Sequence, residues 1–139
     1  MTDFCAPSAE QIRALLTRVR IIAIVGLSPK TGRPSHGVAR ALQAFGYRIV
    51  PVRPAVESIL GEPCYARLED IPFPVDLVDV FRAPQHVPEV VESCLAIHAP
   101  ALWLQDGVIH EAAALRAQSA GLLVVMDRCI YRDYQQFMR

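Results

Sequence analysis

An apolar, β-branched run that ends at a glycine most constrains the fold of this chain. Residues 21–25 read Ile-Ile-Ala-Ile-Val and are followed by Gly26, a loop of small and basic residues, and Ser35 at the start of an apolar helical pattern. This succession is typical of a strand, a ligand loop and a helix N-terminus in an open α/β sheet. Backbone amides at such a helix start suit a phosphate or pyrophosphate, and the loop adds the side chains of Lys30, Thr31 and Arg33.

The alternation of apolar runs and helical patterns continues along the whole chain. We expect one domain over residues 1–139, because this length suits a single core and no linker or repeat interrupts it. Strands that alternate with helices predict an α/β fold, a doubly wound, Rossmann-like parallel sheet with helices on both faces. The expected strands cover residues 21–25, 47–52, 77–81, 101–105 and 122–126. Numbered along the chain, their expected order across the sheet is 3-2-1-4-5, with the switch point between the first and the fourth strand.

Both ends of the chain carry helical patterns. Ser8 and Gln11 form a capping-box-like pair ahead of an apolar stripe, which predicts an amphipathic helix over residues 8–20. The tail, residues 127–139, is expected to fold back as a short helix, because three aromatic residues recur at helical spacing: Tyr131, Tyr134 and Phe137. Between the second and third strands we expect irregular chain with one turn at residues 58–61.

Charge and cysteine content argue against several classes of protein. The 14 acidic and 14 basic residues balance, so no overall field points to nucleic acid or to an anionic membrane surface. The sequence shows neither a secretory signal nor an apolar run of membrane-spanning length, which predicts a cytoplasmic protein. The four cysteines are scattered, and neither they nor the histidines show metal-ligand spacing. We expect free thiols and no metal site.

Ligands of open α/β sheets bind at the carboxyl ends of the strands. Gly26 and Ser28 stand where a dinucleotide fingerprint has its first two glycines, but the G-x-G-x-x-G pattern is incomplete, and the Walker A pattern is missing. Arg53 follows the second strand, where an NAD site would have an acidic residue. A cation there suits a phosphorylated ribose, as in NADP or coenzyme A, or is a solvated charge between two prolines. Pro51 and Pro54 are either a flat wall for adenine or simple strand stops.

Two further strand ends offer contacts to a ligand. Phe81 and Arg82 follow the third strand and either border a nucleotide or are a core aromatic and an exposed arginine. Gln105 ends the fourth strand with a polar group where the apolar run would otherwise continue, which makes it a candidate hydrogen-bonding group. Gly107 would allow a ligand to approach the backbone.

The sequence Asp127-Arg128-Cys129 after the fifth strand has reactive potential. Arg128 could favour the thiolate form of Cys129, whereas the alternative is a buried cysteine beside a structural salt bridge. No set of nucleophile, base and orienting group can be justified from the sequence, so we expect no catalytic residue.

Seven short motifs occur in order along the chain. They are Gly-Leu-Ser at 26–28, Arg-Pro-Ser at 33–35, Pro-Val-x-Pro at 51–54, Ile-Leu-Gly at 59–61, Val-Asp-x-Val-Asp-Val-Phe-Arg at 75–82, Trp-Leu-Gln-x-Gly at 103–107 and Met-Asp-Arg-Cys at 126–129. Together they resemble one family, the small stand-alone CoA-binding proteins. The domain of that family is similar to the CoA-binding domain of the succinyl-CoA synthetase α subunit and of NDP-forming acyl-CoA synthetases. The resemblance covers the chain from about residue 21 to residue 134.

The resemblance implies a Rossmann-type, nucleotide-binding fold with coenzyme A as the cofactor. The loop after the first strand would receive the pyrophosphate, through Gly26, Ser28, Lys30, Arg33 and Ser35. The adenosine and its 3′-phosphate would lie against Pro51, Val52, Arg53 and Pro54. Phe81 and Arg82 would flank the nucleotide, and Gln105 and Gly107 would lie towards the pantetheine arm. The family usually has asparagine where this chain has Arg53, which would either strengthen the 3′-phosphate contact or obstruct the adenosine pocket.

Three functions are compatible with these observations. The first is non-catalytic binding of coenzyme A or an acyl-CoA, without the phosphohistidine and ligase chemistry of the larger synthetases. The second is an NADP-linked reductase that uses the same edge of the sheet, although the incomplete glycine pattern disfavours it. The third is a CoA-responsive interaction subunit of an acyl-CoA enzyme. In that case the macromolecular partner would be the acyl-CoA enzyme. A homo-oligomer of this chain is the other possible assembly.

Overall fold

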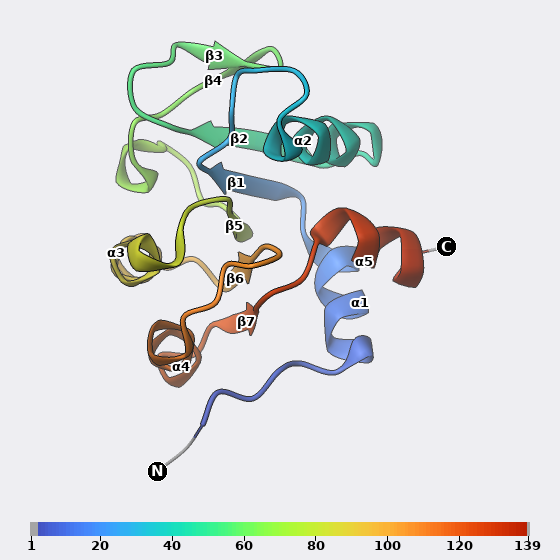
Figure 1. The fold of residues 1–139 in the computed structure, drawn as a ribbon, viewed down its shortest axis with the longest axis vertical. Helices are drawn as coiled ribbons and strands as arrows, with labels where there is room; N and C mark the ends of the chain where they lie inside the picture. The colour runs from blue at the N-terminus through green and yellow to red at the C-terminus, as the bar shows by residue number, and fades with distance from the viewer. Residues whose placement is uncertain (1–2, 139) are drawn as a thin grey trace.

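The computed structural model describes residues 3–138 and has a parallel sheet at its centre (Figure 1). Its five strands are β1 (Ile21–Val25), β2 (Arg48–Val52), β5 (Leu77–Val80), β6 (Ala101–Leu104) and β7 (Leu123–Val125). All residues of β5 and β6 are buried, as expected for strands that are covered on both faces. The predicted α/β class and the five strands are confirmed, with strand ends that differ by at most one residue.

The predicted order of the strands is wrong in one respect. The structure has the order β2-β1-β5-β6-β7, which is 2-1-3-4-5 when the five strands are numbered along the chain. β1 therefore pairs with β5, and the switch point lies between these two strands. Pro51 lies inside β2 and does not stop it. Because proline lacks an N–H group, an edge strand accommodates it best, and β2 is an edge strand.

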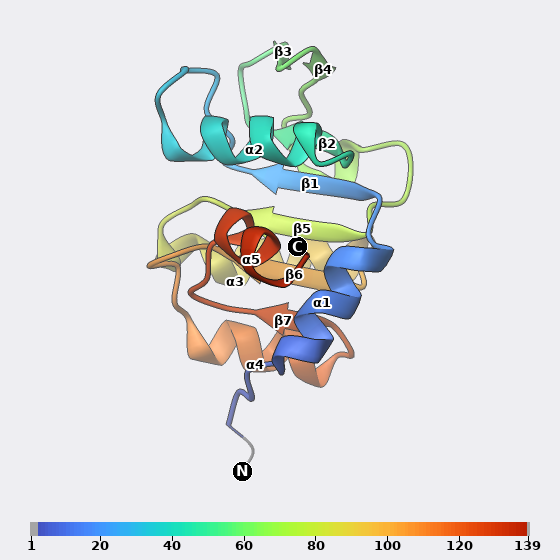
Figure 2. The ribbon, with the colours of Figure 1, turned by 90° about the vertical axis from the view of Figure 1, so that its right-hand side faces the viewer.

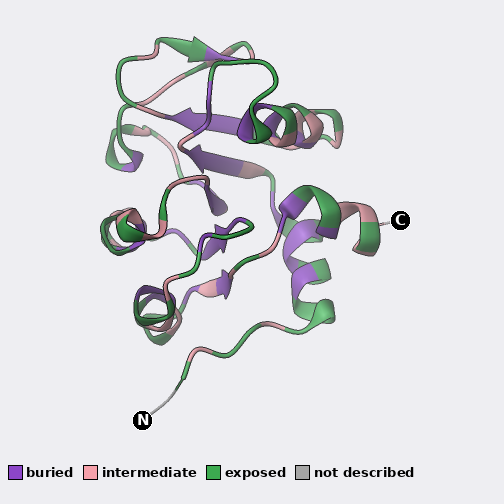
Figure 3. Cartoon of the chain, in the orientation of Figure 1, coloured by how far each residue is buried: buried purple, intermediate pink, exposed green. Residues whose placement is uncertain are grey.

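Helices cover both faces of the sheet (Figures 1 and 2). α1 (Ala9–Arg18), α2 (Pro34–Ala44) and α5 (Ile130–Phe137) lie on one face, and α3 (Val87–Ala96) and α4 (Glu111–Ser119) lie on the other. Each face has its own apolar core, and buried residues concentrate on the strands and the inner sides of the helices (Figure 3). None of the helices in residues 3–138 combines the length and apolarity needed to span a membrane.

The predicted helices at the two ends are present. The Ser8 hydroxyl accepts a hydrogen bond from the Gln11 backbone at 3.1 Å, and the Gln11 side chain accepts one from the Ser8 backbone at 2.8 Å, which completes the capping box of α1. α1 ends at Arg18, two residues before the predicted end. In the tail, α5 returns across the sheet, and its Tyr134 ring stacks on Phe45, the residue that follows α2, with a centroid separation of 3.8 Å.

The segment between β2 and β5 has more structure than the sequence predicts. The expected turn at 58–61 is a short hairpin of β3 (Ser58–Ile59) and β4 (Glu62–Pro63). Leu60 and Gly61 both have positive φ angles, 53° and 78°, as a two-residue hairpin turn requires. Two short 3-10 helices complete the secondary structure, η1 (Leu68–Asp70) here and η2 (Pro84–His86) ahead of α3.

Asp79 is a carboxylate at the centre of the sheet. It lies on β5 in register with Ile24 and Trp103 and has no exposed surface. Neither carboxylate oxygen has a hydrogen-bond partner among residues 3–138. Burial raises the pKa of Asp79 well above its ordinary value, because the charged form loses its hydration.

Candidate functional site

The loop that leaves β1 begins at a position that only glycine can occupy. Gly26 has a φ angle of 84°, and a Cβ there would overlap the carbonyl oxygen of Phe81 and meet the Arg82 side chain. Its N–H donates to the Val52 carbonyl at 3.0 Å. Gly26 thus joins the carboxyl ends of β1, β2 and β5 and fixes where the loop starts.

Two serines hold the rest of this loop in shape. The Ser28 N–H donates to the Ser35 hydroxyl at 2.9 Å, and the Lys30 N–H donates to the Ser28 hydroxyl at 3.1 Å. Both serine side chains are buried, so they are positioning groups of the loop as well as candidate ligand contacts. The loop leads into α2, which has no acidic residue in its first turn and no side-chain cap within the described chain. Its N-terminal amides can therefore attract an anion.

A cavity of about 810 Å³ lies along the carboxyl edge of the sheet, next to the ends of β1, β2, β5 and β6, and Cys129 and Arg132 from the chain beyond β7 complete its wall. The structure brings most of the predicted site residues to its wall, namely Gly26, Ser28, Lys30, Arg33, Ser35, Arg53, Phe81, Arg82 and Gln105. A cavity of this size is within the usual range for a small-molecule or cofactor site.

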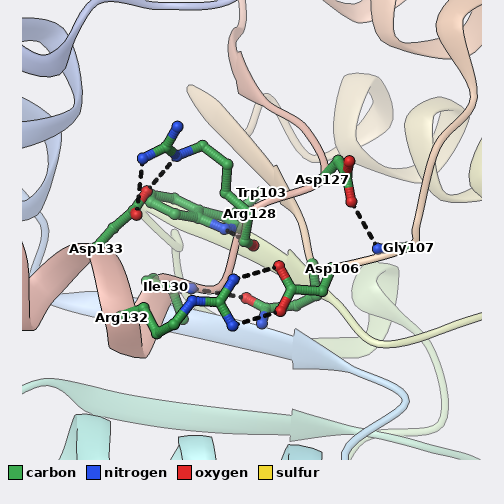
Figure 4. Close-up of polar contacts among 9 residues, drawn as sticks. Trp103, Asp106, Gly107, Asp127, Arg128, Ile130, Arg132 and Asp133 are labelled. Carbon is green, nitrogen blue, oxygen red and sulfur yellow. Dashed lines mark hydrogen bonds and ion pairs between the residues drawn. The ribbon is translucent and has the colours of Figure 1, made fainter.

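The other predicted site residues lie outside this cavity. Val52 and Pro54 line an adjoining cavity of about 500 Å³, which shares Arg53 and Phe81 with the larger one. Pro51 and Gly107 line neither of these two cavities. The Gly107 N–H instead donates to the Asp127 carboxylate at 2.8 Å, as Figure 4 shows. Ligand contacts by these four residues stay predictions.

Positive charge gathers at the β1 and β2 end of the large cavity. Within residues 3–138, Lys30 and Arg33 form no salt bridge, and the Arg53 guanidinium contacts only the Leu27 carbonyl, at 3.4 Å. Arg82 is paired with Glu89 at 3.3 Å. This end of the cavity thus presents three cations without acidic partners, which suits a polyanionic ligand.

The opposite end of the cavity is formed by the chain after β6 and β7. Gln105 is only 4% exposed, and its side-chain oxygen accepts a hydrogen bond from the Ile130 backbone at 3.3 Å. Cys129 lies just before α5 and is also buried. Arg132 forms a two-pronged ion pair with Asp106, with both N–O distances 2.7 Å (Figure 4). Hydrogen bonds from Arg132 lower the pKa of Asp106.

Of the two interpretations of this turn, the structure supports the buried cysteine beside a structural salt bridge, and Arg128 does not pair with the Cys129 thiol. The Arg128 guanidinium turns to Asp133 and forms two hydrogen bonds with its carboxylate, at 2.6 and 3.0 Å. The Arg128 carbonyl accepts a hydrogen bond from the Trp103 indole at 2.8 Å, which ties this turn to β6 (Figure 4). At the Cys129 end of the cavity, the basic side chain on the wall is that of Arg132, which belongs to the first turn of α5.

Several lining residues were missed from the sequence. Pro29, Pro34 and Val38 belong to the loop and first turns that the sequence had already singled out as a ligand site. Asp106 and Val108 follow the fourth strand, so the rule of strand ends points to them too. No feature of the sequence places Arg132 at the cavity, because its position depends on how α5 folds back over the sheet.

All four cysteines are free thiols, as predicted. Among residues 3–138, no group of three or more His, Cys, Asp or Glu side chains is arranged to hold a metal ion.

Comparison with known proteins identifies the family. Residues 20–135 match the model of a family described as the CoA binding domain. The uncharacterized Bacillus subtilis protein YneT is 40% identical over 124 residues, which cover 89% of this chain and 92% of that protein. An ADP-forming acetate–CoA ligase of Archaeoglobus fulgidus is 33% identical over 75 residues, which are 54% of this chain but only 11% of the ligase.

The solved structures agree with this assignment. A hypothetical protein from Pyrococcus horikoshii is 34% identical and superposes with a TM-score of 0.92, with all of both chains covered. Sequence, fold and the extent of the match together show that this chain belongs to the CoA binding domain family.

Proposed function

We propose that this protein binds coenzyme A, or an acyl-CoA, along the carboxyl edge of its sheet without transforming it. The observation that carries this proposal is the shape and charge of the large cavity. It runs from the loop after β1 and the end of β2 to the chain that follows β6, and its cations without acidic partners in the described chain, Lys30, Arg33 and Arg53, come from the β1 and β2 side. Coenzyme A has the matching asymmetry, because its phosphates are at the nucleotide end and its pantetheine arm is uncharged.

The pyrophosphate would lie at the start of α2. Here the amides of the first turn lack a side-chain cap, and Lys30 and Arg33 border the cavity. Both side chains are exposed, so they can approach a phosphate without loss of a salt bridge within the described chain.

The 3′-phosphate would be held by Arg53. Its side chain lies at the junction of the two adjoining cavities, and a single long contact to the Leu27 carbonyl leaves its other donors free. A guanidinium can bind a phosphate with two parallel hydrogen bonds, which favours the interpretation of this arginine as a phosphate contact. The pantetheine arm would then run past Phe81 towards Gln105.

Binding without catalysis is the simplest use of these groups. The titratable side chains on the cavity wall are the cations, the ion-paired Asp106 and the Cys129 thiol. They do not form a nucleophile with a hydrogen-bonded base, the arrangement that acyl transfer needs.

Isothermal titration calorimetry tests the proposal with three ligands. Coenzyme A should bind more tightly than 3′-dephospho-CoA, because only the former offers a phosphate to Arg53. NADPH is the third ligand and represents the reductase hypothesis. Equal affinities for the two CoA forms would contradict the role of Arg53, and an absence of CoA binding would overturn the proposal.

A second candidate function is a CoA-responsive subunit of an acyl-CoA enzyme. It is favoured by the similarity to a segment of the acetate–CoA ligase, since in that protein the matching segment is one part of a much longer chain. Affinity capture of partners with and without added CoA tests it. A set of captured proteins that does not change with CoA would count against this function.

A further inference from the structure

The end of the cavity beyond β6 and β7 has features that simple holding of a ligand does not require. Gln105, Cys129 and Arg132 gather here, on the opposite side of the sheet edge from the unpaired cations. If coenzyme A lies as proposed above, the terminal sulfur of its pantetheine arm comes to this end. The inference that follows rests on that proposed function.

Gln105 presents an unused donor to the cavity. The side chain is nine-tenths buried, and the Ile130 backbone N–H holds its oxygen at 3.3 Å. The fully buried side-chain polar atoms without a partner within residues 3–138 are the two Asp79 oxygens, so the Gln105 amide nitrogen is not one of them and can face the cavity that the residue lines. The carbonyl groups of a pantetheine arm are suitable acceptors for such a donor.

Cys129 presents an unused thiol to the same end. It directly precedes α5 and makes no side-chain capping bond in the described part of the chain. The residue is 8% exposed and lines the cavity, so the cavity is its route to solvent. Gln105 is tied to the backbone of Ile130, the residue that follows Cys129, so both lining residues belong to the same end of the cavity.

We propose that Cys129 undergoes thiol–disulfide exchange with the disulfide form of the CoA-type ligand. The Cys129 thiolate attacks the nearer sulfur of a bound CoA disulfide, so that a bond forms between the two sulfurs and the original sulfur–sulfur bond breaks. The second CoA leaves as a thiolate and takes up one proton, which balances the proton that Cys129 has lost. No external oxidant is needed, because the incoming disulfide is itself the oxidant.

The other thiols provide a contrast within the same chain. Cys5 is exposed and lies near the N-terminus, away from the cavity. Cys64 is half-buried, and burial raises its pKa. Cys94 lies on the buried side of α3, and burial raises its pKa to about 12. Only Cys129, among these four residues, lines the large cavity.

Binding should make the exchange selective. A ligand held beside a thiol presents its disulfide at an effective concentration of about 1 mM. With CoA disulfide at about 10 µM in solution, we therefore expect Cys129 to react about 100-fold faster than the freely exposed Cys5. Glutathione disulfide has no nucleotide to bind, so it should show no such preference.

The experiment treats the fully reduced wild-type protein with CoA disulfide and follows the reaction by intact-mass measurement and peptide mapping. One CoA moiety should appear on Cys129 first and should be released by excess thiol. A Cys5→Ser/Cys64→Ser variant should give the same adduct at the same rate, whereas Cys129→Ser should lose the fast phase. Circular dichroism checks that each variant is folded, and the mapping of wild-type protein does not depend on any variant.

The outcomes separate this inference from the proposed function. Calorimetry with reduced coenzyme A on wild-type protein tests binding alone. If CoA binds but Cys129 reacts no faster with CoA disulfide than with glutathione disulfide, the exchange is refuted while the binding function stands. If reduced CoA does not bind, both are refuted. An early adduct on Cys5 or Cys64 in place of Cys129 would also refute the exchange.

Discussion

The carbonyl oxygen of Phe81 occupies the space that a Cβ atom of Gly26 would need. This contact brings the ends of two neighbouring strands, β1 and β5, together at the switch point of the sheet. Neither the backbone of the loop nor that of the strand end can move away easily, because Gly26 donates to Val52 and Phe81 donates to Val25, at 3.0 and 2.8 Å. The cavity therefore has a fixed floor at the point where the proposed ligand would cross from nucleotide to pantetheine.

Replacement of Gly26 by alanine should destabilise the protein strongly. The new Cβ adds an overlap with backbone to an unfavourable positive φ, and we expect a loss of about 2–4 kcal/mol in the free energy of unfolding. Urea denaturation measures it. Gly32→Ala is the matched control, because Gly32 also has a positive φ, 97°, but no atom lies within 4 Å of its Cβ position. Similar losses in the two variants would show that the contact with Phe81 contributes little.

Replacement of Asp79 by asparagine should change how stability depends on pH. The pKa of Asp79 is raised in the folded protein, so as pH rises the Asp79 carboxyl loses its proton in the unfolded chain before it does so in the folded protein. The wild-type protein should lose stability from about pH 4 upward until the folded-state pKa is passed, and Asp79→Asn removes this loss. The variant should gain stability relative to wild type with increasing pH. Urea titrations at several pH values measure the difference.

Asp76 provides the contrast to Asp79 on the same segment. Its carboxylate accepts hydrogen bonds from the backbone of Arg20 and Ile21, at 3.0 and 2.9 Å. Asp76→Asn should therefore lower stability by about 1 kcal/mol, since the charged acceptor is lost. A stabilising effect of Asp76→Asn, or a constant difference between Asp79→Asn and wild type across the pH range, would contradict this interpretation.

Removal of the two exposed cations of the loop should weaken coenzyme A binding. We expect the double variant Lys30→Ala/Arg33→Ala to lose about 10-fold in affinity, with a weaker dependence on salt than wild type. Calorimetry at two ionic strengths provides both values. Arg13→Ala/Arg18→Ala removes the same charge from the exposed side of α1 and should bind like wild type. Equal losses in the two double variants would point to net charge in place of a local phosphate site.

Replacement of Ser35 by alanine should destabilise the loop between β1 and α2. Its hydroxyl accepts the hydrogen bond of the Ser28 N–H, and the variant leaves that buried donor without a partner. We expect a loss of about 1–2 kcal/mol in stability, together with weaker CoA binding. Ser119→Ala, at the exposed end of α4, should stay within about 0.5 kcal/mol of wild type. An unchanged stability of Ser35→Ala would show that the loop does not depend on this bond.

The positions of the strands could be predicted from the sequence, because buried parallel strands are continuous apolar runs and glycine or proline residues border them. Their order could not, since neighbouring strands are chosen by packing between distant segments. One local signal did bear on it. Pro51 favours an edge position for its strand, and the structure places that strand at the edge.

For the candidate site as well, local features could be predicted from the sequence, whereas contacts that depend on distant packing could not. The rule that ligands meet the carboxyl ends of strands brought Gly26, Arg53, Phe81 and Gln105 together correctly on one cavity wall. It left open whether Arg128 serves Cys129 or a salt bridge, because the partner of Arg128 is Asp133 of α5, whose position depends on how that helix folds back. The position of Arg132 depends on the same return path.

The outer side of β2 has a further consequence for how copies of this protein can meet. Tyr65 pairs with the strand there, with its N–H donating to the Pro51 carbonyl at 3.0 Å and its carbonyl accepting from Arg53 at 2.8 Å. At the other edge of the sheet, β7 is only three residues long. Neither margin offers a long row of free backbone groups, so the sheet is protected against growth by addition of strands from a second molecule. Self-association is therefore expected to use helix or loop surfaces and not paired strand edges.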